Sequence, residues 1–139
     1  MAQLARFGVS MEAELLEAFD KLCARRGYAN RSEAIRDLVR EALVEQEWRG
    51  GREKTCAALC LVYDHHSHDL SHKLMHAQHE AIDQIVSTLH VHLDHDNCME
   101  IIVLRGQARA LQTLADGLIS TRGVKYGRLM VATTGSQLR

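Results

Sequence analysis

The 139-residue sequence contains no proline, only 4% aromatic residues, and no uninterrupted apolar run of the ~18 residues that a membrane-spanning helix needs. Its first nine residues lack the apolar core of a signal peptide, so we expect a cytoplasmic protein of bacterial type. No two cysteines form a CxxC pair, which argues against a disulfide framework in a reducing compartment. The four cysteines are Cys23, Cys56, Cys60 and Cys98.

An excess of positive charge is also missing. The net charge is −1, and residues 1–50 carry eight basic and nine acidic side chains. This balance excludes a generally basic nucleic-acid coat, so any contact with DNA has to come from a local patch. The length allows one medium domain or two small ones.

The N-terminal part predicts a strand followed by two helices. Residues 3–10 alternate between polar and apolar side chains, as a short strand does. Apolar residues then recur at helical spacing over residues 11–26 and 31–47. A strand and two helices bury too little surface for a stable monomer, and one strand needs another to pair with. We therefore expect an obligate dimer with a second copy of the chain.

The ends of these helices carry recognisable signals. Ser10 is a candidate N-cap for the first helix, and Gly27 suits the left-handed position that ends it. Asn30 starts the second helix, with Glu33 three residues later in a capping-box pattern. Ser10 is also placed to contact DNA bases, so both roles stay open.

A second region begins after a polar Gly-Gly stretch at residues 46–54, which we interpret as a linker. The order of elements that follows is β-α-β-β-α-β, in which an antiparallel sheet carries two helices on one face. The other face of the sheet carries no helix, so we expect a partner subunit to cover it. Strands are expected at residues 55–64, 84–93, 98–105 and 123–133, and helices at residues 65–83 and 107–121.

The hairpin at residues 88–98 is the most informative stretch for function. His90 and His92 are two residues apart in a strand, so both imidazoles lie on one face, opposite aliphatic side chains. If the Asp/Asn-rich loop has an odd number of residues, for example residues 95–97, Cys98 returns on the same face. Two imidazoles and a thiolate form a candidate metal site for Ni(II), Cu(II) or Zn(II). The alternative is a half-buried hairpin whose polar face carries histidines by chance.

All nine histidines lie between His65 and His95. Five of them form one stripe on a predicted helix, which is either a solvated face or an accessory metal chelator: His65, His68, His72, His76 and His79. His95 lies in the turn and is expected to support a ligand or stay free. Glu100 shares a strand face with Cys98 and either accepts a hydrogen bond from a ligand imidazole or lies exposed.

Several short motifs resemble one known family. Arg6-Phe-Gly-Val-Ser10, Arg26-Gly-Tyr28 and residues 30–37 (Asn-Arg-Ser-Glu-Ala-Ile-Arg-Asp) resemble the ribbon-helix-helix module of the nickel-responsive transcriptional regulators. Residues 87–92 (Ser-Thr-Leu-His-Val-His) and 95–98 (His-Asp-Asn-Cys) resemble the same family's metal-binding domain. The resemblance covers essentially the whole chain in the same order.

This resemblance implies an α+β protein with three parts. A ribbon-helix-helix (β-α-α) DNA-binding domain would span residues 1–48, and a linker residues 49–54. A ferredoxin-like, ACT-like β-α-β-β-α-β domain for metal binding and tetramerisation would span residues 55–139.

The resemblance also implies a nickel-dependent repressor that acts as a homotetramer, a dimer of dimers. It would bind double-stranded operator DNA when Ni(II), one ion per subunit, occupies a His3Cys site, and would control nickel uptake or nickel-related genes. The site would combine His90, His92 and Cys98 with His79 from a neighbouring subunit. Since Cys98 has to bind as thiolate, metal binding is expected to release protons and to weaken as the pH falls.

The DNA contacts would come from two places. Strands from two chains can pair into a ribbon that enters the major groove, with Arg6, Gly8 and Ser10 facing the bases and Phe7 and Val9 facing the dimer core. Arg6 can contact guanine, whereas Gly8 specifies nothing directly. A second set, at the start of the second helix, would contact a phosphate or only cap the helix: Asn30, Arg31 and Ser32.

Three further alternatives stay open at this point. Glu33 and Asp37 would form a secondary K⁺ site by family resemblance, or would only be neutralised by Arg36, Arg40 or solvent. The chain as a whole could instead be a zinc-type metalloenzyme with Glu100 as general base. It could also be a metal storage or chaperone protein that uses the histidine-rich helix.

Overall fold

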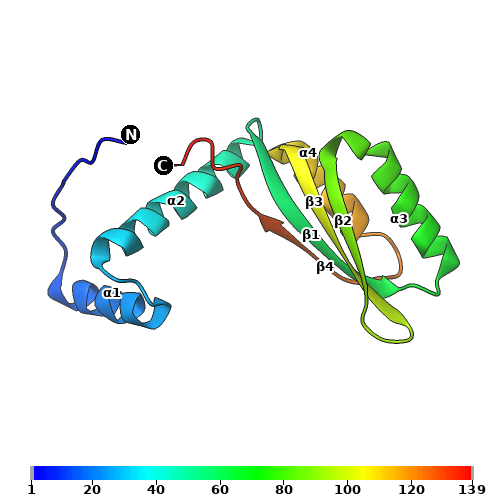
Figure 1. Ribbon diagram of the computed structural model, residues 1–139, viewed down its shortest axis with the longest axis horizontal. Coiled ribbons are helices and arrows are strands. Elements are labelled where there is room, and N and C mark those ends of the chain that lie inside the picture. Colours follow the sequence, from blue (N-terminus) through cyan, green and yellow to red (C-terminus); the bar gives the residue numbers. More distant parts are fainter. Residues whose placement is uncertain (1, 139) are drawn as a thin grey trace. The chain divides into compact units, whose positions relative to one another are not determined.

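The computed structural model describes residues 2–138, which form an α+β fold of two compact units (Figure 1). The first comprises residues up to Leu43 together with the segment after Ser136, and the second spans Val44–Ser136. No helix in this described part of the chain has the length and apolarity to cross a bilayer. The elements in order are α1 (Ala13–Arg26), α2 (Arg31–Gly50), β1 (Lys54–Asp64), α3 (His68–Glu80), a 3-10 turn (Ile82–Gln84), β2 (Ile85–His92), β3 (Asn97–Gln107), α4 (Ala108–Ile119) and β4 (Val124–Val131).

The segment before α1 differs from the sequence prediction. Residues 2–12 have neither helix nor strand in the single chain, although residues 3–10 predict a strand. The physical reason is that a strand requires a hydrogen-bonding neighbour, and the sheet of the second unit is already composed of β1 to β4.

The helix caps are partly as expected. The prediction of Ser10 as N-cap of α1 is wrong, because the helix begins at Ala13 and the extended residue Glu12 occupies the cap position without a side-chain cap bond. Gly27 ends α1 with φ of 77°, as predicted for a left-handed cap. Asn30 is confirmed as a cap, since its Oδ1 accepts a hydrogen bond from the Glu33 N–H at 2.9 Å.

The first unit leaves most of its apolar surface open. Of the described side chains on α1 and α2, only Cys23 and Ala34 are buried. The N-terminal segment exposes Phe7 and Val9 at 74% and 57%. A single copy of this unit therefore has no closed core, as the sequence predicts for a dimeric module.

The second unit is built on one antiparallel sheet with strand order β2-β3-β1-β4. Alternate residues of β1 are buried, beginning at Thr55 and ending at Tyr63. Side chains from α3 and α4 pack against this face of the sheet, including Leu70 and Leu74 from α3 and Leu111 from α4. The topology matches the predicted β-α-β-β-α-β order, with both helices on one face.

The opposite face of the sheet is apolar and uncovered in the single chain. Pairing places Leu89 beside Ile101 and Met130 beside Ala58, on the side away from the helices. Leu89 and Met130 are 57% and 64% exposed. Exposed apolar side chains that lie together on an open sheet face mark an interaction surface.

The stretch interpreted as a linker is more ordered than its composition suggests. Helix α2 continues to Gly50, three residues beyond the predicted end, and the Trp48 indole donates a hydrogen bond to the Ala132 carbonyl at 2.8 Å. The Gly51 carbonyl accepts a hydrogen bond from the Arg109 N–H at 3.1 Å. Because Trp48 also packs on the core of the second unit, this unit includes the end of α2. The domain limits at 48 and 55 stay a prediction.

Candidate metal centre

The loop between β2 and β3 is held by one aspartate. The Asp94 carboxylate accepts hydrogen bonds from the backbone N–H groups of Asp96 and Asn97 at 2.9 and 2.8 Å, and the Asn97 side chain also donates to it. These bonds lower the pKa of Asp94 to about 2, with the Asn97 side chain contributing most. The carboxylate therefore stays ionised at neutral pH and fixes the shape of the loop.

The strand register places the predicted ligands on one face. His92 pairs directly with Cys98, and His90 pairs with Glu100. Five residues, 93–97, separate His92 from Cys98, an odd number as required, and the last of them, Asn97, already belongs to β3. Since residues directly opposite each other in an antiparallel pair share a face, the prediction that Cys98 returns beside His92 is confirmed.

The predicted ligands are neighbours but do not converge on one point in the single chain. The His90 and His92 rings lie 5.3 Å apart between centroids. Within residues 2–138, however, one group alone brings three His, Cys, Asp or Glu ligand atoms within 4.8 Å of one another, and that group is His66, His95 and Asp96. The Cys98 thiol instead donates to the Tyr63 carbonyl over 3.5 Å.

Cys98 is fully buried, and this burial determines its protonation. Removal from water penalises the thiolate and raises the pKa of Cys98, and the nearby carboxylates of Glu100 and Asp64 act in the same direction. The group is therefore a neutral thiol at neutral pH. A metal ion that binds its sulfur has to displace the proton.

Tyr63, Gln78 and Glu100 form a hydrogen-bonded trio next to His90. The Glu100 carboxylate is only 5% exposed and accepts hydrogen bonds from the Tyr63 hydroxyl at 2.6 Å and from the Gln78 amide at 2.8 Å. The Tyr63 ring stands edge-on to His90 with centroids 6.2 Å apart. The alternative of an exposed Glu100 is therefore wrong. Sequence reasoning missed Tyr63 and Gln78, although the alternation along β1 places Tyr63 on this face.

The histidine stripe of α3 faces away from the core. Leu70 and Leu74 are buried, whereas the four stripe histidines that belong to α3 are exposed: His68, His72, His76 and His79. His79 lies in the last turn of the helix. This arrangement agrees with a solvated face along most of the stripe and leaves His79 accessible from outside the chain.

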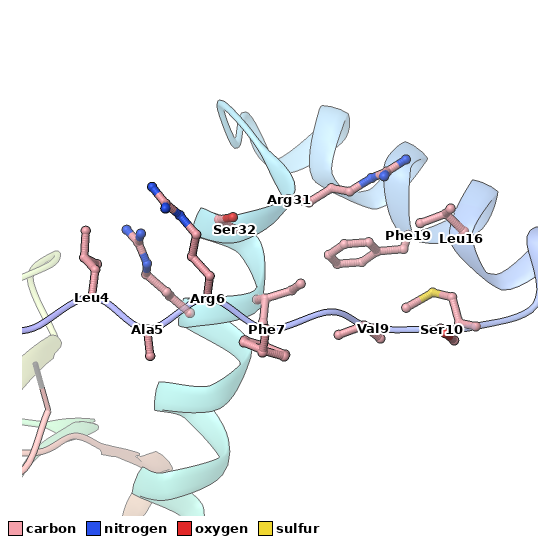
Figure 2. A pocket seen from close by; sticks show the side chains of 13 residues that line it. Leu4, Ala5, Arg6, Phe7, Val9, Ser10, Leu16, Phe19, Arg31 and Ser32 are labelled. Atoms are coloured by element: carbon pink, nitrogen blue, oxygen red, sulfur yellow. The ribbon is translucent and has the colours of Figure 1, made fainter.

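The predicted base contacts lie along the N-terminal segment. Arg6, Gly8 and Ser10 are all exposed. Figure 2 shows this segment beside α1 and the start of α2, bordering a groove of about 840 Å³ whose wall includes Phe7 and Phe19. An apolar groove next to an unpaired strand segment is suited to receive the matching segment of a second copy.

The predicted phosphate contacts are engaged locally. Asn30 caps α2, as the capping alternative states. The Arg31 guanidinium donates two hydrogen bonds to Asp20, each of 2.8 Å, and this arginine lowers the pKa of the Asp20 carboxyl. Ser32 is exposed in the first turn of α2. Phosphate binding by these residues stays a prediction.

The carboxylates predicted for a secondary cation both have partners within the chain. Arg36 donates a hydrogen bond to Glu33. Asp37 accepts hydrogen bonds from the Tyr28 hydroxyl at 2.8 Å and from Arg40 at 3.0 Å. These contacts agree with the neutralisation alternative, and the K⁺ site at Glu33 and Asp37 stays a prediction.

Each half of the chain matches a known protein family. The description "NikR C terminal nickel binding domain" matches residues 56–132, and "Ribbon-helix-helix protein, copG family" matches residues 5–46. Among solved structures, an uncharacterized protein of Thermotoga maritima is similar with a TM-score of 0.53 over 58% of this chain and all of its own. At 15% sequence identity it supports the fold alone.

Full-length relatives agree with these matches. Proteins of Solidesulfovibrio magneticus and Geobacter metallireducens are 54% and 53% identical over 138 residues, covering 99% of each chain, and both carry the name "Putative nickel-responsive regulator". Such regulators are not enzymes, which excludes the zinc-enzyme alternative. With a ribbon-helix-helix domain followed by a nickel-binding domain along its whole length, the chain belongs to the family of nickel-responsive regulators.

Proposed function

We propose that the chain is a nickel-dependent transcriptional repressor that binds operator DNA when Ni(II) is held between subunits, and that it controls nickel uptake or nickel-related genes. The observation that supports this most directly is the strand register. It sets two imidazoles and one buried thiol side by side at one end of a sheet.

The donor set fits nickel. His90, His92 and Cys98 would supply two imidazole nitrogens and a thiolate, a combination that suits Ni(II) or Cu(II) in a planar site. His79 from a second subunit would complete the His3Cys set, and its exposure at the end of α3 supports this assignment. Bound there, one Ni(II) per subunit would supply a link between chains. By the Irving–Williams order Cu(II) binds at least as tightly, so selectivity has to come from geometry or availability.

The residues around the site have a role in positioning. Glu100 lies directly across from His90 and is already fixed by Tyr63 and Gln78. A carboxylate held in this way can orient a ligand imidazole and raise its basicity. Since Gln78 precedes His79 on α3, the same trio ties the helix that would offer His79 to a neighbouring subunit to the strand face that carries the chain's own His90, His92 and Cys98.

The two uncovered apolar surfaces support the proposed assembly. Pairing of two N-terminal segments would bury Phe7 and Val9 and form the two-stranded ribbon, with Arg6 and Ser10 on its outer side. The bare face of the sheet would form the centre of a homotetramer, a dimer of dimers with a DNA-binding dimer at each end. A metal ion that fixes the placement of the two ends would raise the effective concentration at the second half-site.

We expect nickel affinity to rise with pH. The pKa of Cys98 is raised by burial, so the apo protein keeps the thiol proton at neutral pH and loses it on binding. One released proton makes the association constant grow about tenfold for each pH unit until the pH passes the thiol pKa, above which it levels off. Absorption titrations with Ni(II) between about pH 7 and pH 8 test this. An affinity that does not change across this range would contradict thiolate ligation.

Nickel-dependent DNA binding is tested by selection. The full chain is mixed with a random double-stranded DNA pool in the presence of Ni(II), and enriched sequences are assayed by gel shift with Ni(II) and with a chelator. We expect enriched sequences with two related half-sites, and a shift that the chelator reverses. If no sequence is enriched with nickel, the proposed repressor function is wrong, and a storage protein would instead bind metal without any DNA.

A further inference from the structure

The last turns of α2 are attached to the second unit by the segment that follows β4. α2 is one unbroken helix, and its residues from Val44 onward belong to the second unit. The Trp48 indole packs against the hydrophobic core of this unit and donates its N–H to the Ala132 carbonyl at 2.8 Å. One residue further along the chain, the Thr133 hydroxyl donates to the Glu47 carboxylate at 3.3 Å. Residues 84 and 86 positions apart in the sequence thus hold the end of α2 in place.

The Ala132 carbonyl joins α2 to the beginning of β1 as well. It accepts a second hydrogen bond, of 2.9 Å, from the hydroxyl of Thr55, whose side chain is completely buried. The Ala132 N–H donates to the Cys56 carbonyl at 3.1 Å and so continues the pairing of β4 with β1. Both lone pairs of one carbonyl oxygen are therefore used, one by α2 and one by β1. Trp48, Thr55 and Ala132 are together called the clasp below.

The two glycines at the end of α2 do not form a loose joint in the structure. Gly51 is buried, its N–H donates to the Glu47 carbonyl at 3.4 Å, and its carbonyl accepts a hydrogen bond from the Arg109 N–H at 3.1 Å. Its φ of 70° lies in the left-handed region, and an added Cβ would lie 3.3 Å from the Arg109 side chain. The end of α2 is consequently fixed to the second unit from two sides, by the clasp and by the start of α4.

The strand β1 runs from the clasp to the proposed nickel site. Its first residues include Thr55, and its far end carries Tyr63, whose carbonyl accepts the hydrogen bond of the Cys98 thiol. The Tyr63 hydroxyl donates to Glu100. Because β1 is paired with β3 along its whole length and with β4 along most of it, one ordered strand connects the clasp to the residues around the site.

From these contacts we propose that Trp48 is a positioning residue of the nickel response, which fixes the end of α2 to the metal-binding unit. This inference rests on the proposed function. A metal ion that links two second units raises the effective concentration at the second half-site only as far as each α2 is held to its own unit. Loss of the clasp loosens that connection. The gain in DNA affinity from nickel then becomes smaller, while nickel binding itself stays intact.

Trp48→Phe tests the clasp, because phenylalanine keeps an aromatic ring for packing and lacks the indole N–H. Binding of the full chain with Ni(II) is measured by gel shift on selected DNA and on the same DNA with one half-site scrambled. One hydrogen bond is worth about two- to tenfold in an equilibrium constant, so we expect binding to two half-sites to weaken by about that factor. Binding to the single half-site and the thiolate–nickel absorption should not change. Trp48→Ala also removes the packing and should weaken two-site binding further.

Thr55→Val is the matched control. It removes the other donor to the Ala132 carbonyl and keeps the size of the side chain, but that donor comes from β1 rather than from α2. We expect this variant to keep the gain that nickel gives on two half-sites. An equal loss in Trp48→Phe and Thr55→Val would make the stability of the second unit the cause and overturn the role of Trp48. Full two-site binding by both Trp48 variants would overturn it as well.

The clasp itself can be observed by fluorescence, because Trp48 is the only tryptophan of the chain. We expect acrylamide to quench its emission several-fold less efficiently than that of free tryptophan. Quenching as efficient as that of free tryptophan would overturn the clasp without any bearing on nickel-dependent DNA binding. A missing nickel response in the unmodified chain would instead contradict the proposed function, and the role of Trp48 in that response with it.

Discussion

Replacement of Cys98 by alanine is expected to abolish nickel-dependent DNA binding. Cys98 would supply the only thiolate of the proposed site and lies directly across from His92. Loss of a supporting group costs about 10–100-fold in metal affinity, so loss of a ligand is expected to cost at least about a hundredfold. The gel shift with selected DNA should then no longer respond to Ni(II), and the thiolate–nickel absorption should disappear.

The matched control is Cys60→Ala. Cys60 lies on β1 and pairs with Ile101 on the uncovered face of the sheet, away from the histidines. This variant also removes one thiol from a strand of the same sheet, and because alanine keeps a small apolar side chain on the face proposed to form the tetramer centre, it should keep the absorption and the nickel response. A full nickel response in Cys98→Ala would remove Cys98 from the site. An equal loss in both variants would point to the stability of the sheet as the cause.

Replacement of Phe7 by aspartate is expected to abolish nickel-dependent DNA binding, while the chain still binds nickel. Phe7 is 74% exposed in the single chain and is proposed to be buried in the ribbon-helix-helix dimer. Burial of one phenylalanine side chain contributes about 1.5–3 kcal/mol, and a dimer buries two. A carboxylate at this position would have to enter the same apolar interface without a partner, which is strongly unfavourable.

Arg6→Ala is the control for this variant, because it changes the neighbouring residue, which is proposed to face the bases. It should weaken DNA binding in the gel shift by about 1–3 kcal/mol for each guanine that Arg6 recognises, and leave assembly intact. Sedimentation velocity compares the assembly of the two variants, and nickel absorption shows that the second unit is folded. Wild-type DNA binding by Phe7→Asp would contradict the proposed dimer core.

The second unit is where sequence reasoning succeeds best. The strand β1 is predicted from an apolar run that is almost continuous, and in the structure it buries alternate side chains from Thr55 to Tyr63. The hairpin register is local and depends on the number of loop residues, so the neighbourhood of His92 and Cys98 could be predicted. The cap at Asn30 and the glycine at the end of α1 are also local signals, and both are confirmed.

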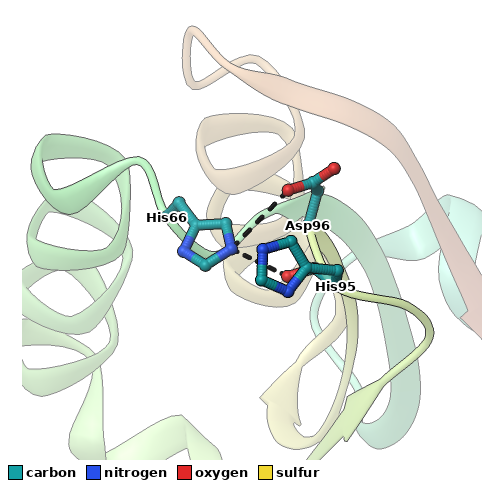
Figure 3. A group of neighbouring side chains, drawn as sticks. All are labelled: His66, His95 and Asp96. Carbon is teal, nitrogen blue, oxygen red and sulfur yellow. Dashed lines mark hydrogen bonds and ion pairs between the residues drawn. The ribbon is translucent and has the colours of Figure 1, made fainter.

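The features that could not be predicted from the sequence depend on contacts between distant segments. The burial of Glu100 requires Tyr63 and Gln78, which come from a different strand and from a helix. The meeting of His66 with His95 depends on the pairing of β1 with β3 (Figure 3). The error at Ser10 has another cause: several positions before a helix can serve as its cap, and here the extended turn into α1 comes at Glu12.

The five residues between His92 and Cys98 have a consequence for how this hairpin can vary during evolution. Gain or loss of a single codon in this loop would exchange the two faces of β3 at the start of the strand, turning the thiol toward the uncovered side. Changes of two codons would preserve the face. Length variation among functional descendants of this gene should therefore occur in steps of two residues at this loop, whereas the loop between β1 and α3 is free of that restriction.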